Sequence, residues 1–197
     1  VRTFKPNIET IKKDLIPLKD KPTKVNATYT VPSFDDNNFR NFSKYGGGVF
    51  NDMSTYAVSI GRVLFDENPH IISGTLLSFD KTKGIDTCFS IKMEFSKGKI
   101  LQGIFGFGLD YKNTLDISGD SFIFKLNRVF SPPADIEIKI KITLDNYSME
   151  KLHKGDTYEN FFDSVLSTYD TKKKLEWSEL ILQDAILTNK LKSVIES

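Results

Sequence analysis

Hydrophobic positions change their spacing along this chain, and the change predicts a helix followed by a strand. Ile8, Ile11 and Leu15 recur at helical offsets between Pro6, which suits a first helical turn, and Pro17. Alternation with polar residues then takes over at four positions before Pro32, namely Val25, Ala27, Tyr29 and Val31. Such alternation is typical of a strand with one buried face. The chain therefore begins with a short amphipathic helix and then enters a sheet.

A polar loop and a run of glycines follow this strand. Ser33–Tyr45 is mostly polar or aromatic and shows no sustained period, and loops of this length usually carry function. It leads directly into Gly46, Gly47 and Gly48, after which the pattern predicts a helix at about Val49–Phe65. A glycine-rich turn therefore joins the loop to the helix.

The stretch from His70 to Leu144 is dominated by alternating segments and predicts a meandering sheet. Two dipeptides within it, Lys97-Gly98 and Gly119-Asp120, have the composition of hairpin turns. They separate Ile85–Phe95 from Ile100–Leu109, and Leu115–Ile117 from Phe122–Phe130. In Asp135–Leu144, isoleucines alternate with Glu and Lys. One face of that strand is therefore expected to be buried, and the other to face solvent or a partner.

Two helices are predicted to end the chain. Asp156 can cap one that runs to about Tyr169, and a longer one is marked by Trp177, Leu180, Leu187, Leu191 and Val194. Helices and strands do not alternate regularly, so the fold class is α+β: a large, predominantly antiparallel mixed sheet packed on one face by helices. We expect residues 1–197 to form a single domain. The start at Val1, with no initiator methionine, indicates a fragment of a longer protein.

Charge and composition exclude several classes of partner. Lys and Arg (27) almost balance Asp and Glu (26), so the chain has no field that would hold nucleic acid or an anionic membrane. No apolar run approaches the roughly 18 residues of a membrane span, and none has the layout of a signal peptide. The lone cysteine, Cys88, lies in an alternating run, which indicates a buried thiol rather than a nucleophile. A reducing, cytoplasmic location is the simplest expectation.

Candidate chemistry gathers between Gly46 and Tyr56. Asp52 and Tyr56 are four residues apart on the predicted helix, so both side chains leave one face of its first turns. They lie near the glycine turn, where we expect backbone N–H groups to be left unpaired. A carboxylate that accepts hydrogen bonds and a phenol that gives or takes a proton would converge there. The alternative is that the helix dipole accounts for Asp52 and core packing for Tyr56.

The segment GGGVFNDMSTYAVSIGRVLF resembles the substrate-side signature of the glucose–fructose oxidoreductase, inositol dehydrogenase and rhizopine-catabolism (Gfo/Idh/MocA) family. In that family three glycines lead to an aspartate and, four residues later, to a histidine or tyrosine. Asp52 and Tyr56 match the tyrosine branch, and Asn38-Phe39-Arg40 resembles the Asn-x-Arg that often precedes the glycines. Tyr111–Phe130, followed by Pro132-Pro133, is similar to the family's strand–Gly–strand unit. The resemblance therefore extends over nearly the whole chain and implies the family's C-terminal fold, which is like that of glyceraldehyde-3-phosphate dehydrogenase.

The resemblance implies an oxidoreductase that transfers hydride between NAD or NADP and a hydroxyl-bearing carbon of a sugar, sugar nucleotide or polyol. Tyr56 would be the proton donor or acceptor at that hydroxyl, and Asp52 would orient the sugar hydroxyls. A phenol, with an ordinary pKa of about 10, needs a neighbouring cation to act as a base, and the family's lysine supplies one. Asn38, Arg40 and the glycines Gly46 to Gly48 would bind substrate, and Arg40 suits a carboxylate or phosphate. Solvated loop residues are an equally good interpretation of Asn38 and Arg40.

The cofactor-binding motifs of the family are missing from this sequence. No G-x-G-x-x-G lies between a strand and a helix, and Gly103, Gly106 and Gly108 have the wrong spacing and fit a strand better. Asp20-Lys21-Pro22 imitates the family's Glu-Lys-Pro motif but lies too near the glycines to be its counterpart. The resemblance thus implies a substrate-binding, sheet-forming half that is inactive alone. NAD(P) and the lysine would be held mainly by an N-terminal domain outside this sequence.

Two other functions stay open. The alternating Asp135–Leu144 and the aromatic Phe122–Phe130 predict an outer sheet face that a second copy could cover, giving a homodimer or tetramer. This pairing could accompany catalysis or replace it in a non-catalytic interaction module. The remaining possibility is a free-standing binder of a small ligand. A metal centre is not expected, because neither His70 nor His153 has a second ligand at metal-site spacing.

Overall fold

Residues 6–15, 18, 20–133, 136–145, 147–154, 156–168 and 173–196 are described by a computed structural model. The helices are α1 (Pro6–Leu15), α2 (Val49–Phe65), α3 (Thr157–Thr168) and α4 (Lys173–Ile195). The strands are β1 (Lys24–Val31), β2 (Ile71–Asp80), β3 (Ile85–Glu94), β4 (Ile100–Phe107), β5 (Lys112–Ser118), β6 (Phe122–Asn127), β7 (Ile138–Leu144) and β8 (Tyr147–His153). Three short 3-10 turns are η2 (Phe39–Asn41), η3 (Ser43–Tyr45) and η4 (Ser96–Gly98). The ends predicted at Asp135 and Tyr169 lie outside the described residues.

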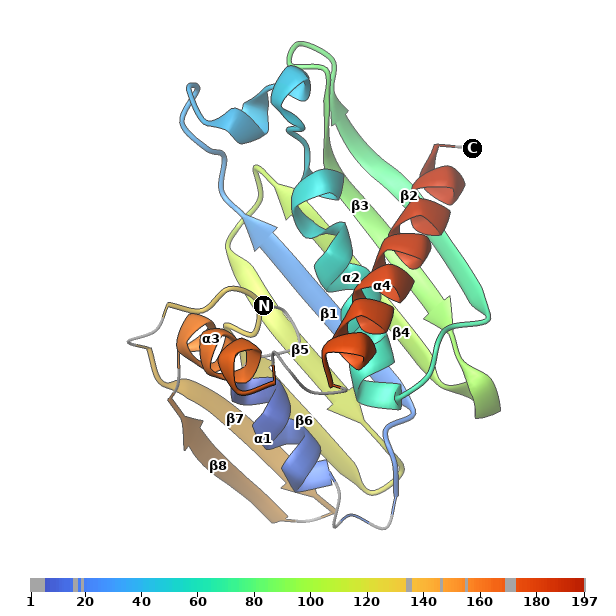
Figure 1. Ribbon diagram of the computed structural model, residues 1–197, viewed down its shortest axis with the longest axis vertical. Helices are drawn as coiled ribbons and strands as arrows, with labels where there is room; N and C mark the ends of the chain where they lie inside the picture. Colours follow the sequence, from blue (N-terminus) through green and yellow to red (C-terminus); the bar gives the residue numbers. More distant parts are fainter. Residues whose placement is uncertain are drawn as a thin grey trace.

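The described strands form one eight-stranded sheet in the order β2-β3-β4-β1-β5-β6-β7-β8 (Figure 1). The hairpin turns predicted at Lys97-Gly98 and Gly119-Asp120 are confirmed, because β3 pairs with β4 and β5 with β6, both antiparallel. The simple meander is wrong at one place. β1 lies between β4 and β5, parallel to the first and antiparallel to the second. Alternation reports which face of a strand is buried and carries no information on its neighbours.

The helices cover one face of this sheet, and the predicted fold class is confirmed (Figure 1). α2 packs across β3 and β4, while α4 lies on β2 and beside α2. Large buried side chains from the strands and from the segments after β3 and β6 make up the core: Phe89, Phe95, Phe105, Phe124, Phe130, Met93, Leu101, Leu115, Ile117 and Leu126. Contacts with the strands and with α4 therefore place α2 against β3 and β4.

Two predictions about the outer strands need correction. The rings of Phe122 and Phe124 are buried on the helix side, so the outer face of β6 carries Ile123 and Lys125 instead of aromatic residues. Strand β8 was not predicted from the sequence at all. As an edge strand it buries little, and most of its side chains with a described exposure are open to solvent, so its sequence shows no clear hydrophobic alternation.

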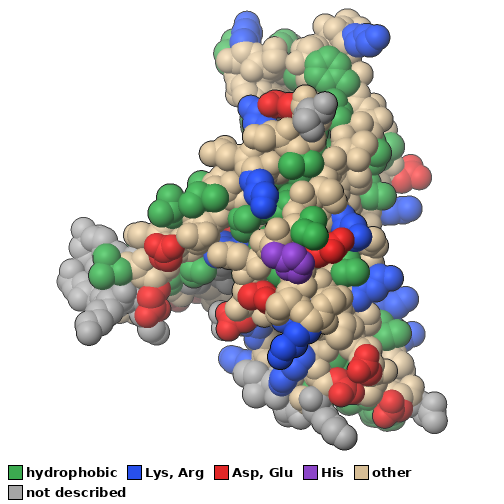
Figure 2. All heavy atoms as spheres, turned by 90° about the vertical axis from the view of Figure 1, so that its right-hand side faces the viewer, with side chains coloured by type: hydrophobic (Ala, Val, Ile, Leu, Met, Phe, Trp, Pro, Cys, Tyr) green, Lys and Arg blue, Asp and Glu red, His purple; other side chains and the backbone are tan. Residues whose placement is uncertain are grey.

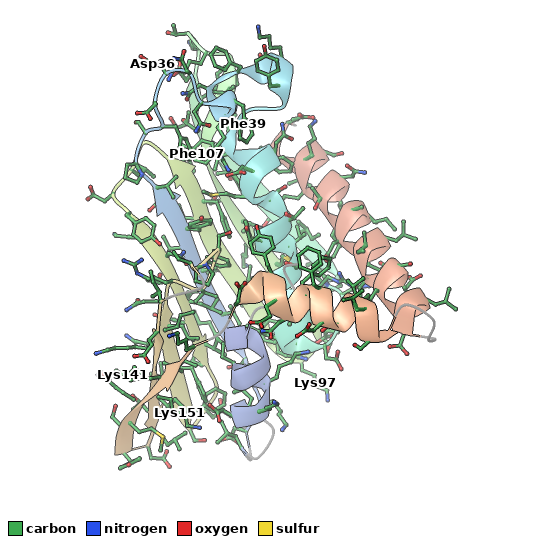
Figure 3. All side chains as sticks on the ribbon, turned by 60° about the vertical axis from the view of Figure 1, so that its left-hand side comes forward. Asp36, Phe39, Lys97, Phe107, Lys141 and Lys151 are labelled. Carbon is green, nitrogen blue, oxygen red and sulfur yellow. The ribbon has the colours of Figure 1, made fainter. Side chains whose placement is uncertain are left out.

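The facing ends of α3 and α4 project from the body of the molecule as an arm (Figures 2 and 3). Large hydrophobic side chains are exposed on both helices: Tyr158, Phe162, Leu166, Leu175, Ile181, Leu182 and Ile186. Figure 2 shows hydrophobic side chains along this arm. α4 is therefore apolar both where it packs on the sheet, at Leu187 and Leu191, and on its outer side.

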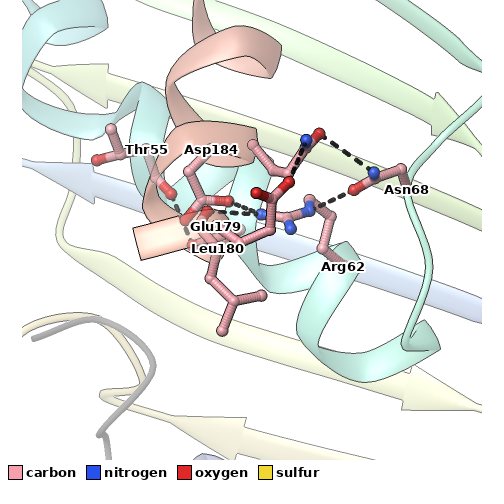
Figure 4. Close-up of polar contacts among 8 residues, drawn as sticks. Thr55, Arg62, Asn68, Glu179, Leu180 and Asp184 are labelled. Carbon is pink, nitrogen blue, oxygen red and sulfur yellow. Dashed lines mark hydrogen bonds and ion pairs between the residues drawn. The ribbon is translucent and has the colours of Figure 1, made fainter. Parts of the chain in front are cut away.

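A polar clamp centred on Arg62 ties α4 to the end of α2 (Figure 4). The guanidinium forms an ion pair with Asp184, donates to the carbonyl oxygen of Leu180 at 3.3 Å and donates through Nε to Oδ1 of Asn68 at 2.6 Å. The side chains of Arg62 and Asp184 are only 10% and 24% exposed. An ion pair sheltered in this way depends on both partners, because removal of one leaves the other charge poorly solvated.

We expect the substitution Asp184→Ala to lower the free energy of unfolding by about 1–3 kcal/mol, because Arg62 loses its charged partner in a sheltered position. Urea denaturation followed by circular dichroism measures the change. The matched control is Glu196→Ala, which removes the exposed Lys192–Glu196 pair and should change stability by less than about 0.5 kcal/mol. Equal effects of the two substitutions would show that the clamp is no stronger than a surface ion pair.

Candidate active site

The glycine turn before α2 is closed by its own backbone. The N–H groups of Gly46, Gly47 and Gly48 donate to the carbonyl oxygens of Ser43, Phe42 and Arg40, at 2.9, 3.0 and 3.0 Å. The expectation that this turn leaves N–H groups unpaired is therefore wrong. The preceding loop folds back in η2 and η3 and supplies the acceptors, which the sequence pattern does not reveal.

Steric reasons explain why glycines occupy this turn. Gly46 and Gly48 have φ angles of 74° and 105°, which other residues rarely adopt. A Cβ at Gly47 would lie 2.5 Å from the carbonyl oxygen of Arg40, and one at Gly48 would collide with the carboxylate of Asp86. The turn is thus a tight backbone crossing, pressed against the start of β3.

Asp86 fixes the first turn of α2. Its Oδ2 accepts a hydrogen bond of 2.5 Å from the backbone N–H of Phe50. Burial raises the pKa of Asp86, while hydrogen bonds from backbone N–H groups, including those of Phe50 and Val49, oppose the rise. A carboxylate at a helix N-terminus satisfies orphan N–H groups and interacts well with the helix dipole. A residue of β3 therefore sets the point at which α2 begins.

Asp52 and Arg40 form an ion pair at the mouth of this turn. Nε of Arg40 donates to Oδ2 of Asp52 at 3.0 Å. Asn38 shapes the loop that carries Arg40, because its Oδ1 accepts from the backbone N–H of Arg40 at 3.1 Å. The fold thus brings together Arg40 of the loop and Asp52 of the helix, which were predicted to share one site. The side chain of Asn38 contacts the backbone of the same loop.

Tyr56 lies one turn further along α2 and contacts a different part of the molecule. Its hydroxyl shares a hydrogen bond with the hydroxyl of Ser131, in the segment after β6. Its ring packs edge to face on Tyr29 of β1 and Phe130, with centroid distances of 5.8 and 5.6 Å. The phenol is therefore held by side chains from β1 and from the segment after β6.

Tyr29 is a second phenol in this cluster, and it was not among the site residues predicted from the sequence. Burial raises the pKa of Tyr29 to about 12, and the nearby Tyr56, Tyr111 and Asp52 add to the rise. A side-chain hydrogen bond with Ser131 opposes it. The available signal was weak: Tyr29 continues the buried alternation of its strand, which is equally typical of a core aromatic.

The segment that presents Ser131 is fixed by Asn113 of β5. The buried Asn113 side chain accepts from the N–H of Phe130 at 2.8 Å and donates to the carbonyl oxygen of Phe130 at 2.5 Å. The N–H of Arg128 also donates to the carbonyl oxygen of Asn113 at 2.6 Å. Ser131 itself has a φ of 47°, an uncommon value for a residue with a side chain. Nothing in the sequence around Ser131 predicted this conformation.

Other candidate residues take structural positions. Gly103 and Gly106 lie within β4, where a Cβ would meet the ring of Phe105 at 2.7 Å or the side chain of Leu109 at 2.8 Å. The thiol of Cys88 is buried, as predicted, and burial raises its pKa. Within the described residues, no cluster of His, Cys, Asp and Glu could hold a metal ion. In the same part of the chain, no helix is both long and apolar enough to cross a bilayer.

The three glycine N–H groups before α2 are not free to bind the pyrophosphate of a dinucleotide cofactor. A pyrophosphate is usually bound by free N–H groups at a glycine-rich helix start. Here the three glycine N–H groups are bonded to carbonyl oxygens, and the glycines of β4 lie in the sheet. The cluster instead offers a phenol, a carboxylate and a guanidinium, which suit a hydroxylated and anionic small molecule.

Comparisons with known proteins agree with this description of the fold. A model of the GFO/IDH/MocA C-terminal domain matches residues 20–123, just over half of the 197 residues. The dTDP-3,4-didehydro-2,6-dideoxy-alpha-D-glucose 3-reductase of Actinomadura kijaniata is 23% identical over 172 residues, which cover 85% of this chain and 51% of that enzyme. The chain thus spans about half the length of this relative.

Solved structures share the fold at low sequence identity. A mutant of KijD10, a 3-ketoreductase from Actinomadura kijaniata in complex with TDP-benzene and NADP, superposes with a TM-score of 0.86 at 17% identity, over 98% of this chain and 61% of KijD10. UDP-N-acetylglucosamine 3-dehydrogenase GnnA from Acidithiobacillus ferrooxidans gives a TM-score of 0.74 at 10% identity, over 99% of this chain and 59% of GnnA. The resemblance seen in the sequence is confirmed, and the chain belongs to the GFO/IDH/MocA family, within which it matches the C-terminal domain.

Proposed function

We propose that residues 1–197 form the substrate-binding half of an NAD(P)-dependent oxidoreductase that acts on a sugar, sugar nucleotide or polyol. The observation that carries the proposal is the placement of Tyr56 and Asp52 on one face of the first turns of α2, beside Tyr29 and Ser131. A sugar nucleotide is the favoured substrate, because the relatives are a dTDP-sugar 3-reductase and a UDP-N-acetylglucosamine dehydrogenase.

The cofactor and its hydride would come from outside this chain. A nicotinamide dinucleotide supplies a hydride donor or acceptor when bound, and the KijD10 complex contains NADP. The present chain spans 51% of the A. kijaniata reductase, and the three glycine N–H groups before α2 are already bonded within their loop. The exposed hydrophobic side chains of the α3–α4 arm support the view that a further part of the protein covers this surface. The chain would therefore be inactive alone.

The role of this chain in the reaction is to hold the substrate hydroxyl and move its proton. Tyr56 would take the proton of the hydroxyl during oxidation and return it during reduction. Ser131 holds the Tyr56 oxygen, and a side-chain hydrogen bond with Tyr29 keeps Ser131 in place. Among the contacts of the described residues, Oδ1 of Asp52 has no hydrogen-bond partner, so it is available to orient a neighbouring hydroxyl.

We also propose that the uncovered face of the sheet pairs with a second copy of the chain. Over β1, β2, β3 and β4 this face has a hollow of about 420 Å³ whose lining is largely uncharged: Asn26, Thr28, Ser73, Thr75, Ser90, Gln102 and Ile104. Lys92 also lines it and is paired with Glu94 at 2.7 Å. A lining with few charges fits the core of an interface, where charged residues are depleted. A cytoplasmic location fits the single, buried cysteine.

In the longer protein that contains this chain, we expect Tyr56→Phe to lower kcat by about 100- to 10,000-fold, because the proton at the substrate oxygen loses its carrier. Steady-state NAD(P)-linked turnover with sugar nucleotides and free sugars measures the loss. Tyr45→Phe, at an exposed tyrosine in the neighbouring loop, is the control and should leave turnover unchanged. Full activity of the Tyr56→Phe enzyme would reject the role assigned to this phenol.

Sedimentation of the chain tests the pairing of the uncovered sheet face. The wild type and the Asp52→Asn/Tyr56→Phe double variant should both sediment as dimers, because neither residue lies on that face. Ile104→Arg should give monomers by placing an unpaired charge in the hollow. Leu152→Arg, at an exposed residue of the edge strand β8, is the control and should remain dimeric. A monomeric wild-type chain would rule out this pairing.

Stability should depend on Tyr29 at high pH. The unfolded phenol ionises near pH 10 and the folded one near pH 12, so the unfolded state releases its proton first. The contribution of Tyr29 is therefore complete below pH 10 and falls by about 1–2 kcal/mol as the pH rises to 12, a value that discounts its partial exposure. Urea unfolding across this range measures the slope.

The variant Tyr29→Phe should lose this extra slope and also the highest step in the spectrophotometric titration of tyrosinate. Tyr45→Phe, at an exposed position, is the matched control and should keep both. An unchanged titration curve in Tyr29→Phe would show that the phenol is not shielded from solvent.

A further inference from the structure

The loop between β1 and α2 presents an aromatic and cationic surface next to the candidate active site. The guanidinium carbon of Arg40 lies 5.0 Å from the ring centroid of Phe34 and 4.6 Å from that of Phe39. Phe34 packs edge to face on Phe107 at 5.0 Å, which anchors this surface to the end of β4. Figure 3 shows Phe39 and Phe107 at the same end of the molecule, near the start of α2.

The ring of Phe39 is exposed where it could contact a ligand. Its exposed fraction is 52%, although the ring supports the Arg40 guanidinium. An exposed aromatic beside a cation is a platform on which a planar group such as a nucleobase stacks, and such stacking accepts any base. The loop therefore offers a planar ligand an apolar surface that the protein itself leaves open.

Arg40 keeps hydrogen-bonding capacity despite its ion pair. The contacts of the described residues engage Nε with Asp52 and give the two terminal amino groups no acceptor. The side chain is 28% exposed. A guanidinium presents a planar fork of donors that matches two phosphate oxygens, so the terminal groups suit a phosphate or diphosphate.

The order of these groups in space matches the order of groups in a sugar nucleotide. Tyr56 lies one helical turn, about 5.4 Å along the axis, from Asp52. Asp52 is bonded to Arg40 at 3.0 Å, and Arg40 is stacked on Phe39. A hydroxyl-binding end, a cation and an exposed aromatic therefore follow one another from α2 to the β1–α2 loop.

We infer that Arg40 and Phe39 bind the diphosphate and the base of a nucleoside diphosphate whose sugar reaches Asp52 and Tyr56. Arg40 donates to the phosphate oxygens through its terminal amino groups while Nε stays on Asp52. Phe39 stacks on the base. This inference rests on the proposed function, and it makes the β1–α2 loop the part of the chain that selects nucleotide-linked sugars over free ones.

Calorimetric titration of the 197-residue chain with UDP, ADP, uridine and pyrophosphate tests the inference without cofactor or turnover. UDP and ADP should bind with similar affinity, and tighter than uridine or pyrophosphate alone. Phe39→Ala should weaken UDP binding about tenfold, by loss of stacking, and leave pyrophosphate binding unchanged. Arg40→Gln should weaken both UDP and pyrophosphate by about tenfold or more.

The matched control is Tyr45→Ala, because Tyr45 is also exposed, at 62%, with Lys44 4.7 Å from its ring centroid, but is not joined to Asp52. This variant should bind UDP within about twofold of the wild type. Equal loss in Tyr45→Ala and Phe39→Ala would overturn the assignment, as would the absence of UDP binding to the wild type. Circular dichroism checks the fold, and Arg40→Lys, which keeps the charge but loses the fork, provides a second variant.

The longer protein separates this inference from the proposed function. Phe39→Ala should raise KM for a nucleotide-linked sugar about tenfold with little change in kcat, whereas Tyr56→Phe acts on kcat. Loss of turnover in Tyr56→Phe with unchanged KM in Phe39→Ala rejects only the nucleotide site. UDP binding that depends on Phe39, together with full activity of Tyr56→Phe, rejects only the proton-transfer role.

Discussion

The hydrogen bond from the N–H of Phe50 to the carboxylate of Asp86 determines where α2 begins, and the position of the whole candidate site depends on it. Asp86 belongs to β3, so the bond ties the helix to the sheet at one point. Gly48 makes the approach possible, because any Cβ there would collide with the carboxylate. A carboxylate at a helix start typically contributes about 1 kcal/mol. Its larger effect here is positional, since a helix shifted by one residue would turn Asp52 and Tyr56 by about 100°.

From this fixed start, α2 sends its two functional side chains to different supports. Asp52 meets Arg40 from the β1–α2 loop, while Tyr56 meets Tyr29 from β1 and Ser131 from the segment after β6. The second support exists because β1 lies between β4 and β5, which brings Tyr29 beneath α2 and β5 next to it. Asn113 in β5 then holds the Ser131 segment through buried hydrogen bonds. One strand insertion thus connects the sheet topology with the orientation of a single phenol.

The two ends of the cluster, at Tyr56 and at Arg40, suit different chemical groups of a ligand. A phenol beside another protonated phenol and a serine is suited to the proton of a hydroxyl group. An arginine paired through one edge and stacked on aromatic rings is suited to an anion and a planar group. The glycine turn between them acts through its shape, because all three of its N–H groups are already bonded within the loop. It fixes the distance between the two ends while making no hydrogen bond that a ligand would replace.

The sequence by itself determined the local features of this protein: the helix Val49–Phe65, the alternation of β1 and β7, two hairpin turns, and the placement of Asp52 and Tyr56 on one helical face. These follow from periodicity and turn composition, which act over a few residues. Only the tertiary structure decided that β1 joins the middle of the sheet, that β8 forms its edge, and that Tyr29, Asn113 and Ser131 surround Tyr56. It also decided that the glycine N–H groups find acceptors in the loop. Each of these outcomes depends on which distant backbone or side-chain groups satisfy one another on folding, and the hydrophobic pattern of a single segment carries no information about its partner.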